Sequence, residues 1–218
     1  MLASSIKAVI FDMDGVLFES NNGHQTAFEA TIAPHGLKDF VYSEVAGMRT
    51  DEALRQVFAK ARRPLSDRLL GRLVSEKRHR ALEILARDGQ VMEGSNELIA
   101  KLRPRYRLAL ASSASTATIG LFLDKSTYGD AFEFCLDGAS VVNAKPNPEI
   151  YQLAVSKLGL KPSQCLVIED AVSGVVAAVA AGAPVIGLAR TVDDADLLQS
   201  GALAVVSELG GIEPLLRS

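Results

Sequence analysis

From Gly94 onward, short apolar runs alternate with stretches of helical periodicity, and this alternation is the feature that most restricts the possible folds. Strands are expected near residues 107–112, 132–136, 165–169, 184–188 and 203–206. Repeated strand–helix–strand units joined by short connections favour a mostly parallel sheet covered by helices. The sequence therefore predicts an α/β fold built on a doubly wound parallel sheet.

An earlier apolar run, from Lys7 to Phe11, ends on Asp12 and Asp14, with Gly15 directly after them. Side chains two residues apart in an extended segment share a face, so a strand ending here would hold both carboxylates in one crevice. Such a crevice can bind a divalent cation and a phosphate. An Asp-x-Asp pair alone does not establish this, because most such pairs are solvated loop carboxylates.

Polar side chains also stand where two later strands are expected to end. Ser112 ends the first of these strands, and Glu169 and Asp170 end the third. Ligands of open α/β sheets bind at the carboxyl ends of the strands, which favours a shared site. Taken alone, Ser112 could be a simple strand-end hydroxyl, and the acidic pair could cap the following helix.

Lys145 opens a helical stretch in which Asn147 is the expected N-cap and Pro148 the expected first helical residue. Taken alone, this lysine could be a solvated surface residue. In an α/β fold, however, the start of a helix lies at the same edge of the sheet as the end of the preceding strand. Lys145 is therefore expected at the same edge as the other polar groups.

Between residues 17 and 89 the periodicity is helical, with helices expected near 22–35, 50–61 and 66–87. A helical module inserted directly after the first strand must stand over the strand ends, and its two connections can act as hinges. Closure over a ligand would then exclude water. The alternative is a rigid structural decoration. The predicted domains are a core of residues 1–16 and 90–218 and a cap of residues 17–89.

Four motifs in fixed order carry a more specific signal than any one of them. They occupy residues 11–17, 110–113, 144–148 and 167–174. Together they resemble the haloacid dehalogenase superfamily of aspartyl phosphotransferases, in the branch with a helical cap after the first strand. The resemblance covers nearly the whole chain and implies a Rossmann-like core.

The resemblance also implies catalytic roles. Asp12 would be the nucleophile that forms an aspartyl-phosphate, and Asp14 would be the general acid and then the general base. Ser112 and backbone amides would hold phosphoryl oxygens, while Lys145 would stabilise charge during transfer.

A magnesium ion is the implied cofactor, because a phosphate dianion repels a carboxylate nucleophile unless cations neutralise it. The implied ligands are Asp12, the Asp14 backbone carbonyl and Asp170, with Glu169 bound directly or through water. Dehalogenases of this superfamily lack an aspartate at the position of Asp14 and need no magnesium. Asp14 therefore disfavours dehalogenation.

Candidate substrate-binding residues are His24, Arg49 and Lys77 in the cap and Ser113 in the core. Arg49 lies in a tight turn before a helix, where it could bind a second anionic group. His24 follows Asp12 by twelve residues, as a histidine does in β-phosphoglucomutases, and Lys77 lies near a cap lysine of those enzymes. His24 could equally be a surface residue.

The basic residues around Lys77 have a simpler reading as well. Lys77, Arg78 and Arg80 together could form a solvated helix face.

The predicted function is a magnesium-dependent phosphatase for a small phosphorylated metabolite, such as a sugar phosphate or phosphoglycolate. A phosphosugar mutase is the alternative, although Ser115 and Thr116 stand where β-phosphoglucomutases tend to have Lys-Asn. A non-enzymatic phosphoacceptor module is disfavoured by the chain length and the cap.

Composition agrees with a compact soluble enzyme, and the two cysteines, expected to be reduced, favour a cytoplasmic location. The chain has 218 residues, 48% of them hydrophobic, and a net charge of -3, which favours neither nucleic acid nor an anionic membrane. The apolar stretch 171–188 is interrupted by glycine and proline, which argues against a membrane span. Cys135 and Cys165 are expected to be reduced core residues. The oligomeric state is left open.

Overall fold

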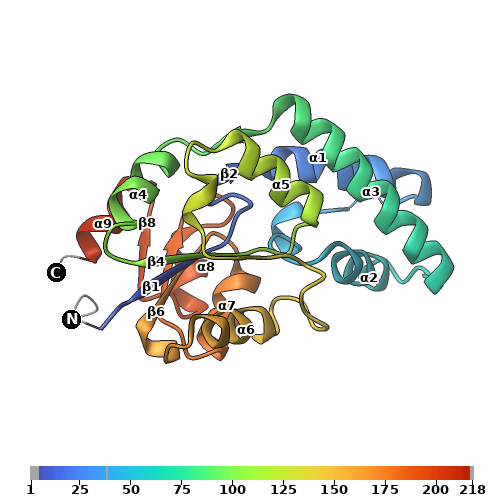
Figure 1. Cartoon of the computed structure of the whole chain (residues 1–218). Helices are drawn as coiled ribbons and strands as arrows, with labels where there is room; N and C mark the ends of the chain where they lie inside the picture. The colour runs from blue at the N-terminus through green and yellow to red at the C-terminus, as the bar shows by residue number, and fades with distance from the viewer. Residues whose placement is uncertain (1–4, 38, 217–218) are drawn as a thin grey trace.

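A computed structural model describes residues 5–37 and 39–216, and a parallel six-stranded sheet forms its centre (Figure 1). The strand order is β5-β4-β1-β6-β7-β8, which places the first strand between two later ones. The strands of this sheet are β1 Ala8–Phe11, β4 Arg107–Ala111, β5 Cys135–Leu136, β6 Cys165–Glu169, β7 Val185–Leu188 and β8 Ala204–Val206. The predicted α/β class is confirmed.

Helices cover both faces of the sheet. Strand β1 shows the division, because Val9 and Phe11 pack in one apolar cluster while Ala8 and Ile10 pack in the other. The first cluster includes side chains of α4 Ser95–Leu102, α5 Thr116–Lys125 and α9 Ile212–Leu215. The second includes side chains of α6 Glu149–Leu158, α7 Val172–Ala180 and α8 Asp194–Gln199.

The helical insertion follows the turn after β1 and lies at one end of the molecule (Figure 1). It contains α1 Asn21–Ile32, α2 Thr50–Lys60 and α3 Asp67–Asp88, which pack around an apolar cluster of their own. Strands β2 Phe18–Glu19 and β3 Gln90–Val91 pair antiparallel at its base. The predicted helical insertion is confirmed, while its boundaries at residues 17 and 89 stay a prediction.

Short 3-10 helices complete the secondary structure. They are Ala33–His35, Tyr42–Glu44, Gly129–Ala131, Pro162–Gln164 and Leu209–Gly211.

Three predicted elements differ from the structure at their ends. The helix expected over 22–35 ends as an α-helix at Ile32, because Pro34 has no N–H for an α-helical hydrogen bond. Helix α6 begins at Glu149, after the predicted start at Pro148. The Asn147 side chain nevertheless makes the expected capping bond, accepting the Glu149 N–H at 3.0 Å. The strand expected over 132–136 is reduced to β5.

Both cysteines are free thiols. Cys135 lies in β5 and Cys165 in β6, with β4 and β1 between them in the sheet. Burial raises the pKa of each thiol to about 11, so both are protonated at neutral pH. Every helix in the described part of the chain is too short or too polar to span a bilayer.

Candidate active site

The carboxyl ends of three neighbouring strands bring the core motifs together. Asp12 follows β1, Ser112 follows β4 and Glu169 ends β6, and these strands are adjacent in the sheet. Lys145, from the loop before α6, donates to Asp12 Oδ1 at 2.6 Å and to Glu169 Oε1 at 2.7 Å. All four side chains are buried. The structure therefore brings together the core residues that the sequence analysis singled out, while their catalytic roles stay a prediction.

Each oxygen of the Glu169 carboxylate accepts two hydrogen bonds. Oε1 accepts from Lys145 and from the Tyr151 hydroxyl at 2.7 Å, and Oε2 accepts the backbone N–H groups of Asp170 and Ala171. Gly174 makes room for it, since a Cβ there would lie 1.7 Å from Oε1. Tyr151 was not predicted as a site residue. Its position on the helix that follows Lys145 was the available signal.

Oxygen atoms of Asp12, Glu169 and Asp170 lie within 4.8 Å of one another, a cluster that could hold a metal ion. Burial raises the pKa of Asp12, as do the neighbouring carboxylates, while Lys145 acts in the opposite direction. Burial and the charge of Glu169 raise the pKa of Asp170 to about 7. One ammonium for three buried carboxylates leaves negative charge that a divalent cation would neutralise, and an all-oxygen donor set fits a hard cation.

Two residues outside the predicted motifs hold Asp170. The Thr191 hydroxyl donates to Asp170 Oδ2, and Asn21 Nδ2 donates to the same oxygen at 3.3 Å. Asn21 begins α1 of the insertion, whereas Thr191 lies in the loop after β7. No pattern in the sequence pointed to either residue, because their proximity depends on the tertiary fold.

Asp14 connects the core site to the cap. Its Oδ1 accepts from Ser20 Oγ at 2.5 Å and is 3.2 Å from His24 Nε2. Burial alone would raise the pKa of Asp14, but His24, the Ser20 hydroxyl and the charge of Lys77 lower it overall. Asp14 is therefore ionised at neutral pH.

His24 and Lys77 form a buried pair beside Asp14. His24 Nδ1 is 2.9 Å from Lys77 Nζ, and the two residues are only 8% and 5% exposed. Burial lowers the pKa of Lys77 to about 7, and burial with the Lys77 charge lowers the pKa of His24. The alternative readings of His24 as a surface residue and of Lys77 as a solvated one are wrong, because both side chains face the interior.

Core and cap together enclose a chamber of about 40 Å³. Asp12, Asp14 and Ser113 line it from the core, and His24 and Lys77 line it from the cap. Further cap residues that line the chamber are Phe28, Tyr42, Met48 and Arg78. The structure thus brings three of the four predicted substrate residues to one chamber.

The neighbours of Lys77 on α3 are exposed, as the solvated-face reading expects. Arg78 is exposed although it also lines the chamber, and Arg80 pairs with Glu76 at 2.9 Å on an exposed face.

Arg49 lies apart from this chamber. Its guanidinium binds the Asp51 carboxylate through two nitrogens, at 2.7 and 3.0 Å. It also donates to the backbone carbonyls of Gly138, Val141 and Val142. All five N–H donors of the side chain are therefore engaged, and a second anionic group could bind Arg49 only if these bonds were released.

The fold and the site define a class of protein: a parallel α/β enzyme in which a strand-end aspartate, a lysine and an acidic cluster lie beneath a helical cap. Residues 6–182 match the haloacid dehalogenase-like hydrolase family, and the chain belongs to this family. It is a phosphatase of that family, a phosphoric monoester hydrolase.

Individual relatives agree with this assignment. The chain is 36% identical over 195 residues to protein CbbY of Rhodobacter capsulatus, covering 83% of this chain and 84% of that protein. It is 30% identical over 206 residues to a phosphorylated carbohydrates phosphatase of Thermotoga maritima. This match covers 92% of this chain and 94% of that protein. The structure of a hydrolase from Pseudomonas syringae shares the fold, with a TM-score of 0.89 at 23% identity and coverage of 97% and 98%.

Proposed function

We propose that the protein is a magnesium-dependent phosphatase that hydrolyses a small phosphorylated metabolite through an aspartyl-phosphate on Asp12. The observation that carries this proposal is the arrangement of Asp12 and Asp14 in one chamber with different partners. Asp12 contacts Lys145, whereas Asp14 contacts Ser20 and His24. These environments suit a nucleophile and a proton-transfer group respectively.

In the proposed reaction, an Asp12 oxygen attacks phosphorus and the bond to the leaving alkoxide breaks. Asp14, ionised in the free site, would take up a proton from solvent when the substrate dianion binds, because a nearby negative charge raises the pKa of a carboxyl group, and it would give that proton to the alkoxide. The resulting Asp14 carboxylate then takes a proton from water, which attacks the phosphorus of the intermediate and frees Asp12. The lowered pKa of Asp14 in the free site keeps it in the carboxylate form that this second step requires.

Lys145 would neutralise charge on the phosphoryl oxygens during both steps. Magnesium, when bound by Asp12 and Asp170, would supply further positive charge to those oxygens. Glu169 is better suited to hold Lys145 than to bind the metal directly, because both of its oxygens already accept two hydrogen bonds each.

A sugar phosphate is the substrate class that the surroundings support best. Lys77 and Arg78 provide positive charge on the cap side of the chamber. A relative that shares 30% identity along most of its length is a phosphatase of phosphorylated carbohydrates. Because the chamber measures only about 40 Å³, the cap must open to admit such a molecule.

Mutase chemistry is the second candidate, and the structure offers it less support. A mutase must hold a second phosphate at the distal end of the site. Ser115 caps α5, and the Thr116 hydroxyl donates to Asp137, so this segment supplies no cation. Arg49 has its donors engaged elsewhere.

A panel of phosphomonoesters with magnesium would test the proposal, with inorganic phosphate and isomer formation measured in the same samples. We expect phosphate release equal to substrate loss, with no need for a bisphosphate activator. Rapid interconversion of β-glucose 1-phosphate and glucose 6-phosphate with little phosphate release would overturn it.

A further inference from the structure

The carboxylate of Asp170 is held from three sides by segments that are distant in the sequence. Thr191 Oγ1 and Asn21 Nδ2 both donate to Oδ2, and Asn21 Nδ2 also lies 2.6 Å from Thr191 Oγ1. The three side chains thus form a closed triangle of hydrogen bonds. The residues of the triangle come from the end of β6, the start of α1 and the loop after β7.

Gly15 lies against the remaining side of the Asp170 carboxylate. Its φ is +77°, and a Cβ at this position would lie 1.9 Å from Asp170 Oδ2 and 2.5 Å from Asn21 Nδ2. The catalytic turn therefore packs directly against the triangle, and the Asp170 carboxylate has little room to rotate.

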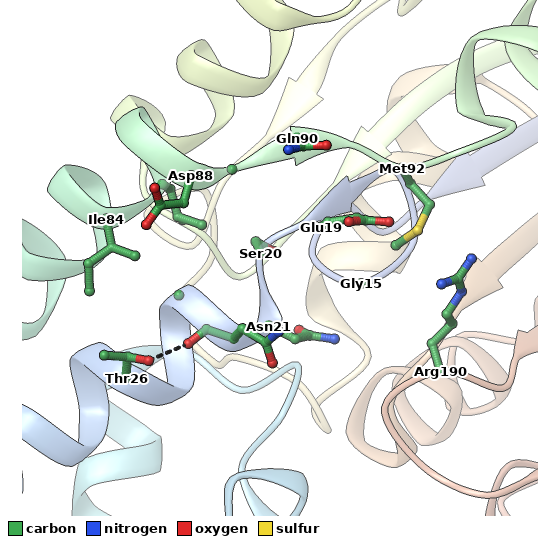
Figure 2. A pocket seen from close by; sticks show the side chains of 14 residues that line it. Gly15, Glu19, Ser20, Asn21, Thr26, Ile84, Asp88, Gln90, Met92 and Arg190 are labelled. Atoms are coloured by element: carbon green, nitrogen blue, oxygen red, sulfur yellow. Dashed lines mark hydrogen bonds between the residues drawn. The ribbon is translucent and has the colours of Figure 1, made fainter.

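On its other side, Asn21 lines a hinge cavity of about 480 Å³, together with Gly15 and Arg190 (Figure 2). Asn21 is thus part of the wall between this solvent-accessible cavity and the acidic cluster. The Tyr42 hydroxyl, from the cap, is 3.4 Å from Asn21 Oδ1. A donor at Oδ1 orients the amide so that its NH₂ group faces Asp170 and Thr191.

We propose that Asn21 and Thr191 are positioning residues that set the metal affinity of Asp170. Both hydrogen bonds that the described residues make to its carboxylate fall on Oδ2, which leaves Oδ1 without a hydrogen bond from those residues and able to bind a cation together with Asp12. The inference rests on the proposed function, in which Asp12 and Asp170 bind magnesium. Asn21 belongs to α1 of the cap, so the metal affinity of the core site would depend on a cap residue.

Loss of an outer hydrogen bond to a metal ligand typically weakens metal binding about 10- to 100-fold. We expect Thr191→Val, which keeps the side-chain shape and removes the hydroxyl, to weaken metal binding by about that factor. Asn21→Ala should act in the same direction. Because both residues contact one oxygen and each other, the double variant should lose less than the product of the two single effects.

The test is a titration of the whole protein with Mn²⁺ without substrate, in which electron paramagnetic resonance measures the free ion. Thr191→Ser should bind Mn²⁺ like the wild type, because it restores the hydroxyl. Thr26→Val is the matched control, since it removes a hydroxyl that lines the same hinge cavity and that, among the described residues, bonds to the Asn22 carbonyl alone. Melting curves recorded without metal show whether each variant folds.

Two results would count against the inference, and they are distinguishable. If the wild type binds no Mn²⁺ at the acidic cluster, the proposed metal dependence fails, and the inference with it. If the wild type binds and the folded Thr191→Val and Asn21→Ala variants bind equally well, only the positioning role is overturned. Should Thr191→Val fail to fold, Asn21→Ala decides the question, because Asn21 borders the hinge cavity.

Discussion

At the scale of single residues, Asp12 is the first to test. Asp12→Asn keeps the shape of the side chain but removes the attacking carboxylate, so turnover should fall by several orders of magnitude. Lys145 would retain its bond to Glu169, and the fold should survive. Single-turnover phosphate release, with circular dichroism as the folding control, measures both effects. An active Asp12→Asn enzyme would disprove the mechanism.

Asp14 should affect the second half of the reaction. Asp14→Asn cannot take a proton from water, so hydrolysis of the aspartyl-phosphate should slow about 100- to 10,000-fold. The intermediate should then accumulate and be visible by mass spectrometry of acid-quenched enzyme. Fast turnover without accumulation would assign the base to another group.

Lys77 predicts a pH dependence with a defined sign. Its pKa is lowered to about 7 by burial, so the side chain is a cation below that pH and becomes neutral above it. The KM for an anionic substrate should therefore rise as the pH increases through 7. Lys77→Met should have a high KM already below pH 7, and this KM should not rise further as the pH increases through 7. A KM profile shared by the two enzymes would exclude Lys77 from substrate binding.

At the scale of elements, the start of α2 is fastened to the loop before α6. The Arg49 guanidinium bonds three carbonyls of that loop, and Glu52 Oε1 accepts the Ala144 N–H at 3.1 Å. Ala144 directly precedes Lys145 in the chain. These contacts join the closed cap to the backbone that carries the catalytic lysine.

This arrangement predicts how Arg49→Ala should behave. Loss of the contacts would disfavour the closed cap, so we expect a lower kcat and a higher KM for substrates with one phosphate and with two alike. Steady-state kinetics on a matched pair of monophosphate and bisphosphate sugars would measure this. A KM increase confined to the bisphosphate would instead support the distal-anion role suggested by the sequence.

The sequence predicted the positions of those polar residues that directly follow an apolar strand. Asp12 and Ser112 end apolar runs, and the parallel topology then places them at one edge of the sheet. It missed Tyr151, Asn21 and Thr191, which meet their partners only through tertiary packing. Strand β5 was overestimated because residues 132–136 together suggest a full strand, although only Cys135 and Leu136 pair with β4.

At the scale of the whole molecule, metal removal is the broadest test. Chelation with EDTA should abolish phosphatase activity and Mg²⁺ should restore it, because the buried carboxylates repel a phosphate dianion. Ca²⁺, which prefers larger and less regular coordination, should inhibit. Release of phosphate from substrate by metal-free enzyme, verified by elemental analysis, would contradict the magnesium assignment.

The helical insertion packs around its own apolar cluster, and β2 and β3 at its base are only two residues long each. A part that carries its own core can diverge without disturbing the packing of its host, provided that the residues that contact the acidic site, namely Ser20, Asn21 and His24, are kept. A relative's cap grafted between β2 and β3, with these three residues retained, should therefore transfer that relative's substrate preference. The core residues Asp12, Asp14 and Lys145 would remain unchanged and would act on the new substrate.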